Sequence, residues 1–262
     1  MGGTPRRPAP MPEAVVRPGA EPWSVPGGPH GALLLHGFTG NPASMRGLAE
    51  AFVAAGFAVE LPRLPGHGTS VDDLLTTRFP DWAAAAESSY TDLAGRCDEV
   101  VVAGLSMGGT LAAWLASRHP RIAGLVTING MFDPPAPEFD ELLREAMAQG
   151  VDHLPPVGSD IADPTVKEEA YEAAPIEPLL SLFEGQRELY ERLGVIRCPV
   201  LILSSNQDHI VPPVSAEVLA ERVLGPVERI NLERSYHVAT LDYDKDIVIE
   251  QAVKFARRVT AR

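Results

Sequence analysis

Ser106 lies at the centre of a Gly-x-Ser-x-Gly pentapeptide, residues 104–108, between two segments of different character. The preceding residues 100–103 form an uninterrupted apolar run that is mostly β-branched, which is typical of a strand buried on both faces. The following residues 110–118 are rich in Ala and Leu, which favours a helix. A serine on a tight strand-to-helix turn is a nucleophile elbow, and glycines two residues away let the backbone segments approach closely. The pentapeptide alone is weak evidence, because it should occur by chance in roughly one chain of this length in ten.

A serine hydroxyl is a poor nucleophile and needs a general base to accept its proton, with an acid to orient that base. After such an elbow the order along the chain is serine, then aspartate or glutamate, then histidine. His237 lies late in the chain, between the last strand-like and the last helix-like segment. We therefore predict that His237 is the base for a nucleophilic Ser106.

Asp208 follows the strand-like residues 200–203 and precedes His237, which is the place expected for the acid. Beside the imidazole, its carboxylate would fix the tautomer and stabilise the imidazolium. Asp133, after the preceding strand, is a rival acid, but its neighbours are the prolines of the next segment, and we favour Asp208. His209, adjacent to Asp208, is expected to point elsewhere.

Acyl transfer also needs two N–H donors for the negative charge that develops on the carbonyl oxygen. The backbone N–H of Met107 is one candidate, because Met107 follows the nucleophile and opens a predicted helix whose dipole favours negative charge. The backbone N–H of Phe38 is the second, in the His36-Gly37-Phe38 loop directly after the strand-like residues 32–35. We expect His36 to hold this loop by hydrogen bonds rather than to act as a base.

The segments that must position these residues alternate between strand-like and helix-like, which indicates a mostly parallel sheet with helices on both faces. The predicted strands are 32–35, 57–60, 100–103, 125–128, 200–203 and 228–232, and the predicted helices around them are 44–55, 81–94, 110–118, 214–223 and 245–258. The candidate residues follow strand ends, and the carboxyl edge of an open α/β sheet is where ligands bind.

The alternation breaks between residues 131 and 178, a stretch with eight prolines and two helical candidates, 138–149 and 164–173. Because it follows a strand at the ligand edge, we interpret it as a cap over the site rather than a long surface loop. The core helix is expected to resume near 179–193. The predicted domains are a disordered Pro-, Gly- and Arg-rich extension (1–22), a core (23–130 and 179–262) and the cap (131–178).

The composition bounds the function classes. A chain of 262 residues, 45% hydrophobic and 22% charged, suits one large α/β domain. The net charge of -13 argues against a nucleic-acid partner and against electrostatic attachment to anionic lipid.

No apolar run approaches the length of a membrane span, and the first twenty residues lack the apolar region of a secretory signal, so we expect a cytoplasmic protein. No metal-ligand spacing or nucleotide-binding motif is present, so we predict no metal and no cofactor. The sequence does not predict the oligomeric state.

Four runs carry a resemblance to a known family: residues 33–41 (LLLHGFTGN), 66–68 (GHG), 104–109 (GLSMGG) and 235–242 (SYHVATLD). In order and separation they are similar to motifs of the small bacterial carboxylesterases and monoacylglycerol lipases of the α/β-hydrolase superfamily, across about residues 30–258. The resemblance implies an α/β-hydrolase fold with a small cap inserted after the sixth strand, and no cofactor. It also implies a triad of Ser106, Asp208 and His237, with the amides of Phe38 and Met107 as oxyanion donors.

The resemblance further implies hydrolysis of esters with short- to medium-chain acyl groups, including monoacylglycerols, through an acyl-enzyme on Ser106. The same triad could serve a thioesterase or a C–C hydrolase, and the fold could belong to a ligand-binding protein that turns over slowly. The chain departs from the family in two places. It has Tyr236 where the family often has Gly before the histidine, and residues 131–178 are its least similar part.

Overall fold

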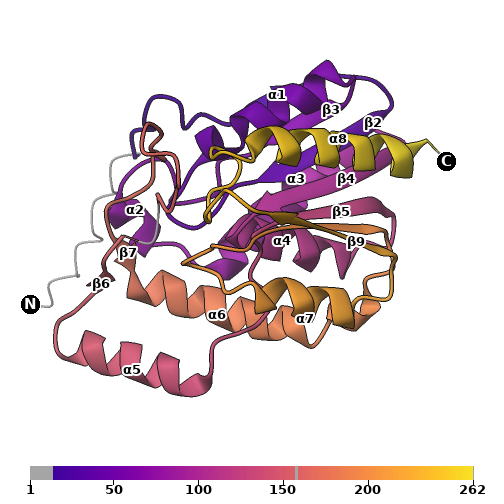
Figure 1. The fold of residues 1–262 in the computed structure, drawn as a ribbon. Coiled ribbons are helices and arrows are strands. Elements are labelled where there is room, and N and C mark those ends of the chain that lie inside the picture. The colour runs from indigo at the N-terminus through magenta and orange to yellow at the C-terminus, as the bar shows by residue number, and fades with distance from the viewer. Residues whose placement is uncertain (1–13, 157–158, 262) are drawn as a thin grey trace, which may run out of the picture.

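The computed structural model describes residues 14–156 and 159–261, which form one central sheet between layers of helices (Figure 1). The sheet has seven strands in the order β1-β3-β2-β4-β5-β8-β9. Its strands are β1 (Trp23–Val25), β2 (His30–Leu35), β3 (Ala58–Leu61), β4 (Glu99–Leu105), β5 (Ile122–Ile128), β8 (Val200–Ser205) and β9 (Val227–Leu232). Only β1 is antiparallel to its neighbour, β3, and the other adjacent pairs of the sheet are parallel.

Helices cover both faces of the sheet, as the alternation in the sequence predicts. One face carries α1 (Arg46–Ala54) and α8 (Lys245–Thr260), while the other carries α3 (Phe79–Ala94), α4 (Met107–Ala116) and α7 (Val214–Arg222). A further helix, α6 (Ile176–Tyr190), packs on α3 and α4. Short helices η1 (Pro42–Met45), α2 (Val71–Leu75) and η2 (Leu193–Val195) lie in the connections.

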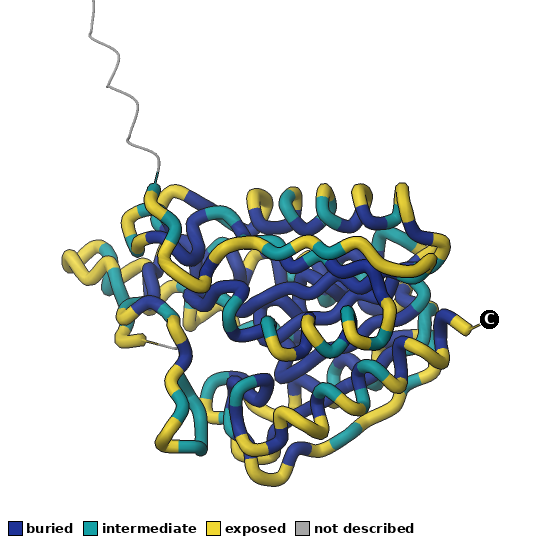
Figure 2. Tube along the Cα trace, turned by 90° about the horizontal axis from the view of Figure 1, so that it is seen from above, coloured by how far each residue is buried: buried dark blue, intermediate teal, exposed yellow. Residues whose placement is uncertain are grey.

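The strand β4 shows why a central strand is apolar throughout. Val100 and Val102 pack in the hydrophobic core below α3 and α4, whereas Val101 and Ala103 pack in the core below α1 and α8. Successive side chains of a strand point to opposite faces, so a strand covered on both sides has no solvent-facing position. Figure 2 shows the consequence, with buried strands between helices that are exposed along their outer sides.

The segment between β5 and α6 contains α5 (Pro137–Ala148), β6 (His153–Leu154) and β7 (Ala174–Pro175), and β6 pairs with β7. The predicted helix over 138–149 is confirmed as α5, which packs against α6. The cap segment was predicted to follow the sixth strand, but along the described chain it follows the fifth, β5. Five described strands, including the short antiparallel β1, precede this segment.

The predicted helix over 164–173 is wrong, because these residues form no helix. Their backbone groups bond to the loop that follows β2 instead of to each other. The N–H of Tyr171 donates to the carbonyl of Thr39 at 3.0 Å, and the side chain of Asn41 donates to the carbonyl of Glu169. A peptide group engaged in this way is not available for the i to i−4 bonds of a helix.

The N-terminal extension is described from residue 14 onward, and residues 1–13 of the predicted disordered part lie outside the described residues. Ala20 is fully buried, and the N–H of Arg17 donates to the carbonyl of Gly68 at 2.8 Å. The Arg17 guanidinium also lies 4.8 Å from the centre of the Tyr171 ring. Residues 14–22 therefore pack on the body of the protein, in correction of the predicted disorder for this part.

Candidate active site

The turn between β4 and α4 has the geometry of a nucleophile elbow. Ser106 has φ 54° and ψ -120°, a backbone conformation that non-glycine residues rarely adopt and that costs free energy. A Cβ on Gly104 would lie 2.1 Å from the carbonyl carbon of Gly108, and a Cβ on Gly108 would lie 2.0 Å from the carbonyl oxygen of Leu35. Both positions therefore require glycine, as the sequence pattern suggested.

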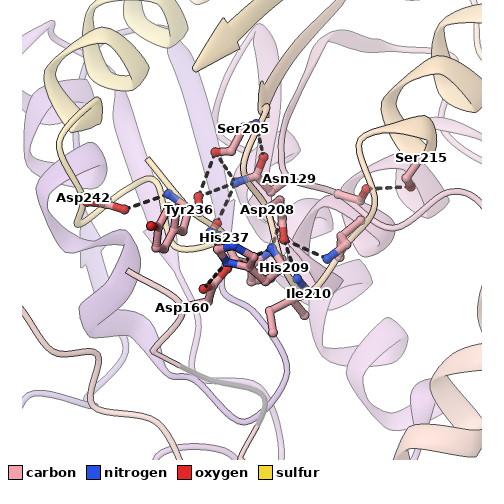
Figure 3. Close-up of polar contacts among 12 residues, drawn as sticks. Asn129, Asp160, Ser205, Asp208, His209, Ile210, Ser215, Tyr236, His237 and Asp242 are labelled. Carbon is pink, nitrogen blue, oxygen red and sulfur yellow. Dashed lines mark hydrogen bonds and ion pairs between the residues drawn. The ribbon is translucent and has the colours of Figure 1, made fainter. Parts of the chain in front are cut away.

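Asp208 and His237 meet at the carboxyl edge of the sheet (Figure 3). Asp208 lies in the loop after β8, and its Oδ2 is 2.7 Å from Nδ1 of His237, in the loop between β9 and α8. The side chains are 2% and 7% exposed, respectively. Oδ1 of Asp208 accepts hydrogen bonds from the N–H groups of Ile210 and Val211, both at 2.8 Å. With its oxygens held as acceptors, the carboxylate places the imidazole proton on Nδ1 and leaves Nε2 free to accept one.

The other two candidates for the acid and base are excluded from this pair. Asp133 is exposed at the start of the segment after β5, and it is not a hydrogen-bond partner of His237. His209 points away, as expected, with a side chain that is 60% exposed and an Nδ1 that is 2.8 Å from Asp160.

Ser106 and His237 line one small pocket, together with Phe38 and apolar side chains from the segment after β5 and from α6. Its volume is about 50 Å³. Sites for small organic ligands occupy roughly 300–1,000 Å³, so the pocket must widen to admit an ester. The hydroxyl of Ser106 and the imidazole of His237 are not hydrogen-bonded to each other within the described part of the chain, and such contacts are often long until substrate binds.

A larger cavity of about 450 Å³ lies at the amino edge of the sheet, beside Tyr90 and Cys97, and contains none of the candidate residues.

The residues Phe38 and Met107, whose amides are the predicted oxyanion donors, both lie close to Ser106 in the chain or in space. Met107 is the first residue of α4, and Phe38 follows Gly37, whose Cβ position would be 3.5 Å from the Cβ of Ser106. Among the hydrogen bonds of residues 14–156 and 159–261, neither N–H donates to a protein acceptor. An unpaired N–H in a buried place is costly unless water or a ligand satisfies it, so the two amides are available to a ligand oxygen.

His36 holds the loop after β2, as expected from the sequence. The N–H of Leu64 donates to Nε2 of His36 at 3.1 Å, which leaves Nδ1 to donate to the carbonyl of Gly37 at 3.0 Å. Burial lowers the pKa of His36 to about 4, so the ring is neutral at pH 7 and fits this pattern. The ring of His67 lies 5.1 Å away, and burial also lowers its pKa well below the usual value.

Glu168 lines the same pocket and was not predicted. It is 7% exposed, and burial raises the pKa of its carboxyl. A Cβ on Gly40 would lie 2.9 Å from Oε1 of Glu168, so this glycine makes room for the carboxyl. The sequence gives no sign of it, because Glu168 lies in a Lys-Glu-Glu stretch of residues 164–173, which were predicted to form a helix.

Asn129 was also missed, although its place directly after β5 could have identified it. Its φ is 46°, and its Nδ2 donates to the carbonyl of His237 at 2.7 Å while its Oδ1 accepts from the N–H of Ser205 at 2.7 Å.

Tyr236 stands where the family often has glycine, and its N–H donates to Asp242 at 2.8 Å. Tyr236 is not among the described residues with a positive φ, so the histidine loop does not need glycine at this position.

A serine on a strained elbow, facing a carboxylate-bound imidazole across a pocket with free amides, is suited to acyl transfer. With a mostly parallel sheet that carries these groups at its carboxyl edge, the chain falls in the class of α/β serine hydrolases.

Comparison with known sequences narrows this class. The profile of the alpha/beta hydrolase family matches residues 32–251, and the chain belongs to this family. It is 46% identical over 244 residues to a thermostable monoacylglycerol lipase of Bacillus sp. (strain H-257), with 92% of this chain and 95% of that protein covered. It is 27% identical over 250 residues to a carboxylesterase of Bacillus subtilis (strain 168), with 94% and 98% covered.

A solved structure shows the same relation. A chain from work on LipS and LipT, two metagenome-derived lipolytic enzymes, superposes with a TM-score of 0.87 at 40% identity, and covers 93% of this chain and 100% of that chain. The chain is thus a carboxylic ester hydrolase with the α/β-hydrolase fold. Within the described residues, no helix combines the length and apolar character needed to span a membrane.

Proposed function

We propose that the chain cleaves carboxylic esters through an acyl-enzyme on Ser106, with His237 as general base and Asp208 as the acid that orients it. The single observation that carries the assignment is the buried 2.7 Å hydrogen bond between Asp208 and His237, at the pocket that His237 shares with Ser106. The strained φ of Ser106 supports it, because such strain is common where a nucleophile must be presented.

The reaction follows from these roles. Oγ of Ser106 attacks the ester carbonyl carbon, and its proton passes to Nε2 of His237. The carbonyl oxygen becomes negative and accepts hydrogen bonds from the N–H groups of Phe38 and Met107. When the C–O bond to the alcohol breaks, the proton on His237 passes to the leaving oxygen. Water then attacks the acyl carbon and gives a proton to Nε2 of His237. When the bond to Oγ of Ser106 breaks, this proton passes to Oγ, and the carboxylic acid and the free enzyme are released.

The proposed substrates are esters of short- to medium-chain acyl groups, including monoacylglycerols. Two findings support this substrate class: the relative named as a monoacylglycerol lipase is 46% identical, and the pocket beside Ser106 is lined largely by apolar side chains. We further propose that residues 131–178 form the cap over this pocket, with 23–130 and 179–262 as the core. Met131 and Glu168 of the proposed cap line the pocket, which supports this division. The cytoplasmic location stays a prediction from the sequence.

The test is a panel of p-nitrophenyl acyl esters, monoacylglycerols and acyl thioesters with the wild type and Ser106→Ala. We expect the wild type to cleave the oxygen esters and Ser106→Ala to lose that activity with an unchanged circular dichroism spectrum. Activity that survives in Ser106→Ala would contradict the assigned nucleophile. A wild type that cleaves thioesters at least as fast as oxygen esters would favour the thioesterase alternative.

A further inference from the structure

The backbone of His237 is held on both sides by side chains from other parts of the chain (Figure 3). Its N–H donates to Oδ2 of Asp160 at 3.2 Å, and its carbonyl accepts from Nδ2 of Asn129 at 2.7 Å. Together with the bond from its imidazole to Asp208, His237 is held at three points. The contact from Asp160 is unexpected, because this residue belongs to the segment between β5 and α6, 77 residues before His237.

Asp160 also binds the loop that carries the acid. Its Oδ2 accepts from the N–H of His209 at 3.1 Å, and its Oδ1 lies 2.8 Å from Nδ1 of His209. Its own carbonyl accepts from the N–H of Val238 at 3.1 Å. Its side chain is 14% exposed, so water competes with these bonds only in part. One carboxylate therefore joins the residue after the proposed acid to the proposed base.

A second carboxylate fixes the same part of the chain to the histidine loop. Oδ2 of Asp242 accepts from the N–H of Ala162 at 2.7 Å and from the N–H of Tyr236 at 2.8 Å. Oδ1 of Asp242 accepts from the N–H of Asp163 at 3.1 Å. Residues 160–163 thus lie against the histidine loop through four hydrogen bonds that involve both carboxylates and the backbone of 160.

We propose that Asp160 is a positioning residue for the reaction, which sets the backbone of His237 relative to Asp208 by accepting the N–H groups of both loops. The proposal rests on the assigned roles of Asp208 and His237. Asp208 and His237 both lie in loops, outside the helices and strands. Hydrogen bonds to side chains must therefore hold their backbone in place, because the hydrogen bonds of a helix or strand do not. Displacements of about 1 Å in a catalytic group can lower a rate by about a hundredfold. Residues of the proposed cap would then contribute to the chemical step as well as to the pocket.

The experiment compares Asp160→Ala, Asp160→Asn and Asp163→Ala on a p-nitrophenyl ester. In Asp160→Ala both backbone N–H groups lose their acceptor, and we expect kcat to fall at least about tenfold with KM changed less than about twofold. Asp160→Asn keeps an acceptor oxygen and should retain kcat within about threefold of wild type. Asp163→Ala is the matched control, because among the described residues the Asp163 carboxylate accepts hydrogen bonds only from Thr165. It should keep wild-type kcat.

A spectroscopic measurement separates positioning from a general loss of structure. We expect the proton between Nδ1 of His237 and Asp208 to give a downfield resonance in proton NMR of the wild type. This resonance should weaken or shift in Asp160→Ala but not in Asp163→Ala. Wild-type kcat in Asp160→Ala, or equal losses in Asp160→Ala and Asp160→Asn, would overturn the proposal. Asp160→Ser replaces Asp160→Ala if the latter does not fold, since its hydroxyl is too short to reach both amides. Retained activity in Ser106→Ala would refute the proposed function instead, whatever the NMR spectrum shows.

Discussion

Replacement of Asp208 by asparagine tests the proposed site most directly, because the structure predicts which way the new amide must face. Oδ1 of Asp208 accepts from two backbone N–H groups, of Ile210 and Val211, whereas Oδ2 faces Nδ1 of His237. In Asp208→Asn the amide oxygen can satisfy only one of these sides. The other side receives the NH₂ group, which donates hydrogen bonds and cannot accept them.

The two orientations differ in free energy. If the NH₂ group faced Ile210 and Val211, two buried N–H donors would lose their acceptor, at a cost of about 1–3 kcal/mol each. The oxygen should therefore stay with the two amides, and the NH₂ group should face His237. Nδ1 of His237 must then accept a hydrogen bond, so its proton moves to Nε2, which can no longer take the proton of Ser106.

We expect kcat to fall by about 10³- to 10⁴-fold, close to the loss known for the equivalent change in a serine protease triad. At about 1.4 kcal/mol for each factor of ten, this is about 4–5.5 kcal/mol of transition-state stabilisation. KM should change little, because the variant has the same shape. The assay is the steady-state hydrolysis of a p-nitrophenyl ester, with Asp133→Asn as the matched control.

The exposed Asp133 should tolerate the same substitution with kcat within about twofold of wild type, as surface changes usually do. A kcat of Asp208→Asn within tenfold of wild type would show that Asp208 does not orient His237 in this way. A collapse of kcat in Asp133→Asn instead would show that Asp133 is the acid.

Three further predictions concern the elbow and the buried groups around it. Gly108→Ala should abolish soluble folded protein, because the new Cβ would lie 2.0 Å from the carbonyl oxygen of Leu35. Gly47→Ala in α1 should raise the melting temperature slightly, because among the described residues its Cβ would meet no atom within 4 Å apart from its chain neighbours and its own helix backbone. His36 has a pKa of about 4 in the folded chain and of about 6.5 in the unfolded chain, so between these values only the unfolded chain binds a proton at His36. The free energy of unfolding should therefore fall by about 3 kcal/mol as the pH is lowered from 6.5 to 4. His36→Gln should weaken this dependence of the melting temperature on pH. Burial raises the pKa of Glu168 above its unfolded value, so stability falls as pH rises through the folded pKa, and Glu168→Gln should melt higher than wild type at pH 8 but not at pH 4.

Each of these has a clear contrary result. Soluble, active Gly108→Ala would show that the close approach of β4, α4 and β2 can relax. An equal dependence of the melting temperature on pH in wild type and His36→Gln across pH 4–7 would show that folding does not lower the pKa of His36. A melting temperature of Glu168→Gln below that of wild type at pH 8 would show that the ionised carboxyl is stabilised by its surroundings rather than destabilised by burial.

The sequence predicts most of the sheet and the helices on its faces, because these depend on short-range patterns. The apolar run before Ser106 is typical of a strand covered on both sides, and the structure places it as β4 in the middle of the sheet. Amphipathic or Ala-rich runs mark α3, α4 and α8 in the same way, within two or three residues at their ends. The strand β1 escaped prediction, since three residues are too few to show a period.

The segment after β5 is where prediction from the sequence fails. Residues 164–173 have the composition of a helix, yet their backbone groups bond to Thr39 and Asn41, more than 120 residues earlier. Propensity is a weak preference, of less than about 1 kcal/mol per residue, and tertiary hydrogen bonds outweigh it. The helix α5 keeps its predicted place because an apolar side packs on α6.

The sequence was sufficient to identify the candidates for the chemistry of the site, because the proposed nucleophile, acid and base follow in order along the chain and each leaves a local mark. The elbow requires glycines, and the acid and base follow strand ends. What only the tertiary structure decided is how these groups are held: the carboxylate of Asp160 and the amide of Asn129 on the backbone of His237, and Glu168 in the pocket. These contacts join residues 77 and 108 positions apart. A hydrogen bond between such residues depends on the folded path of the whole chain, and no local pattern of residue types records that path.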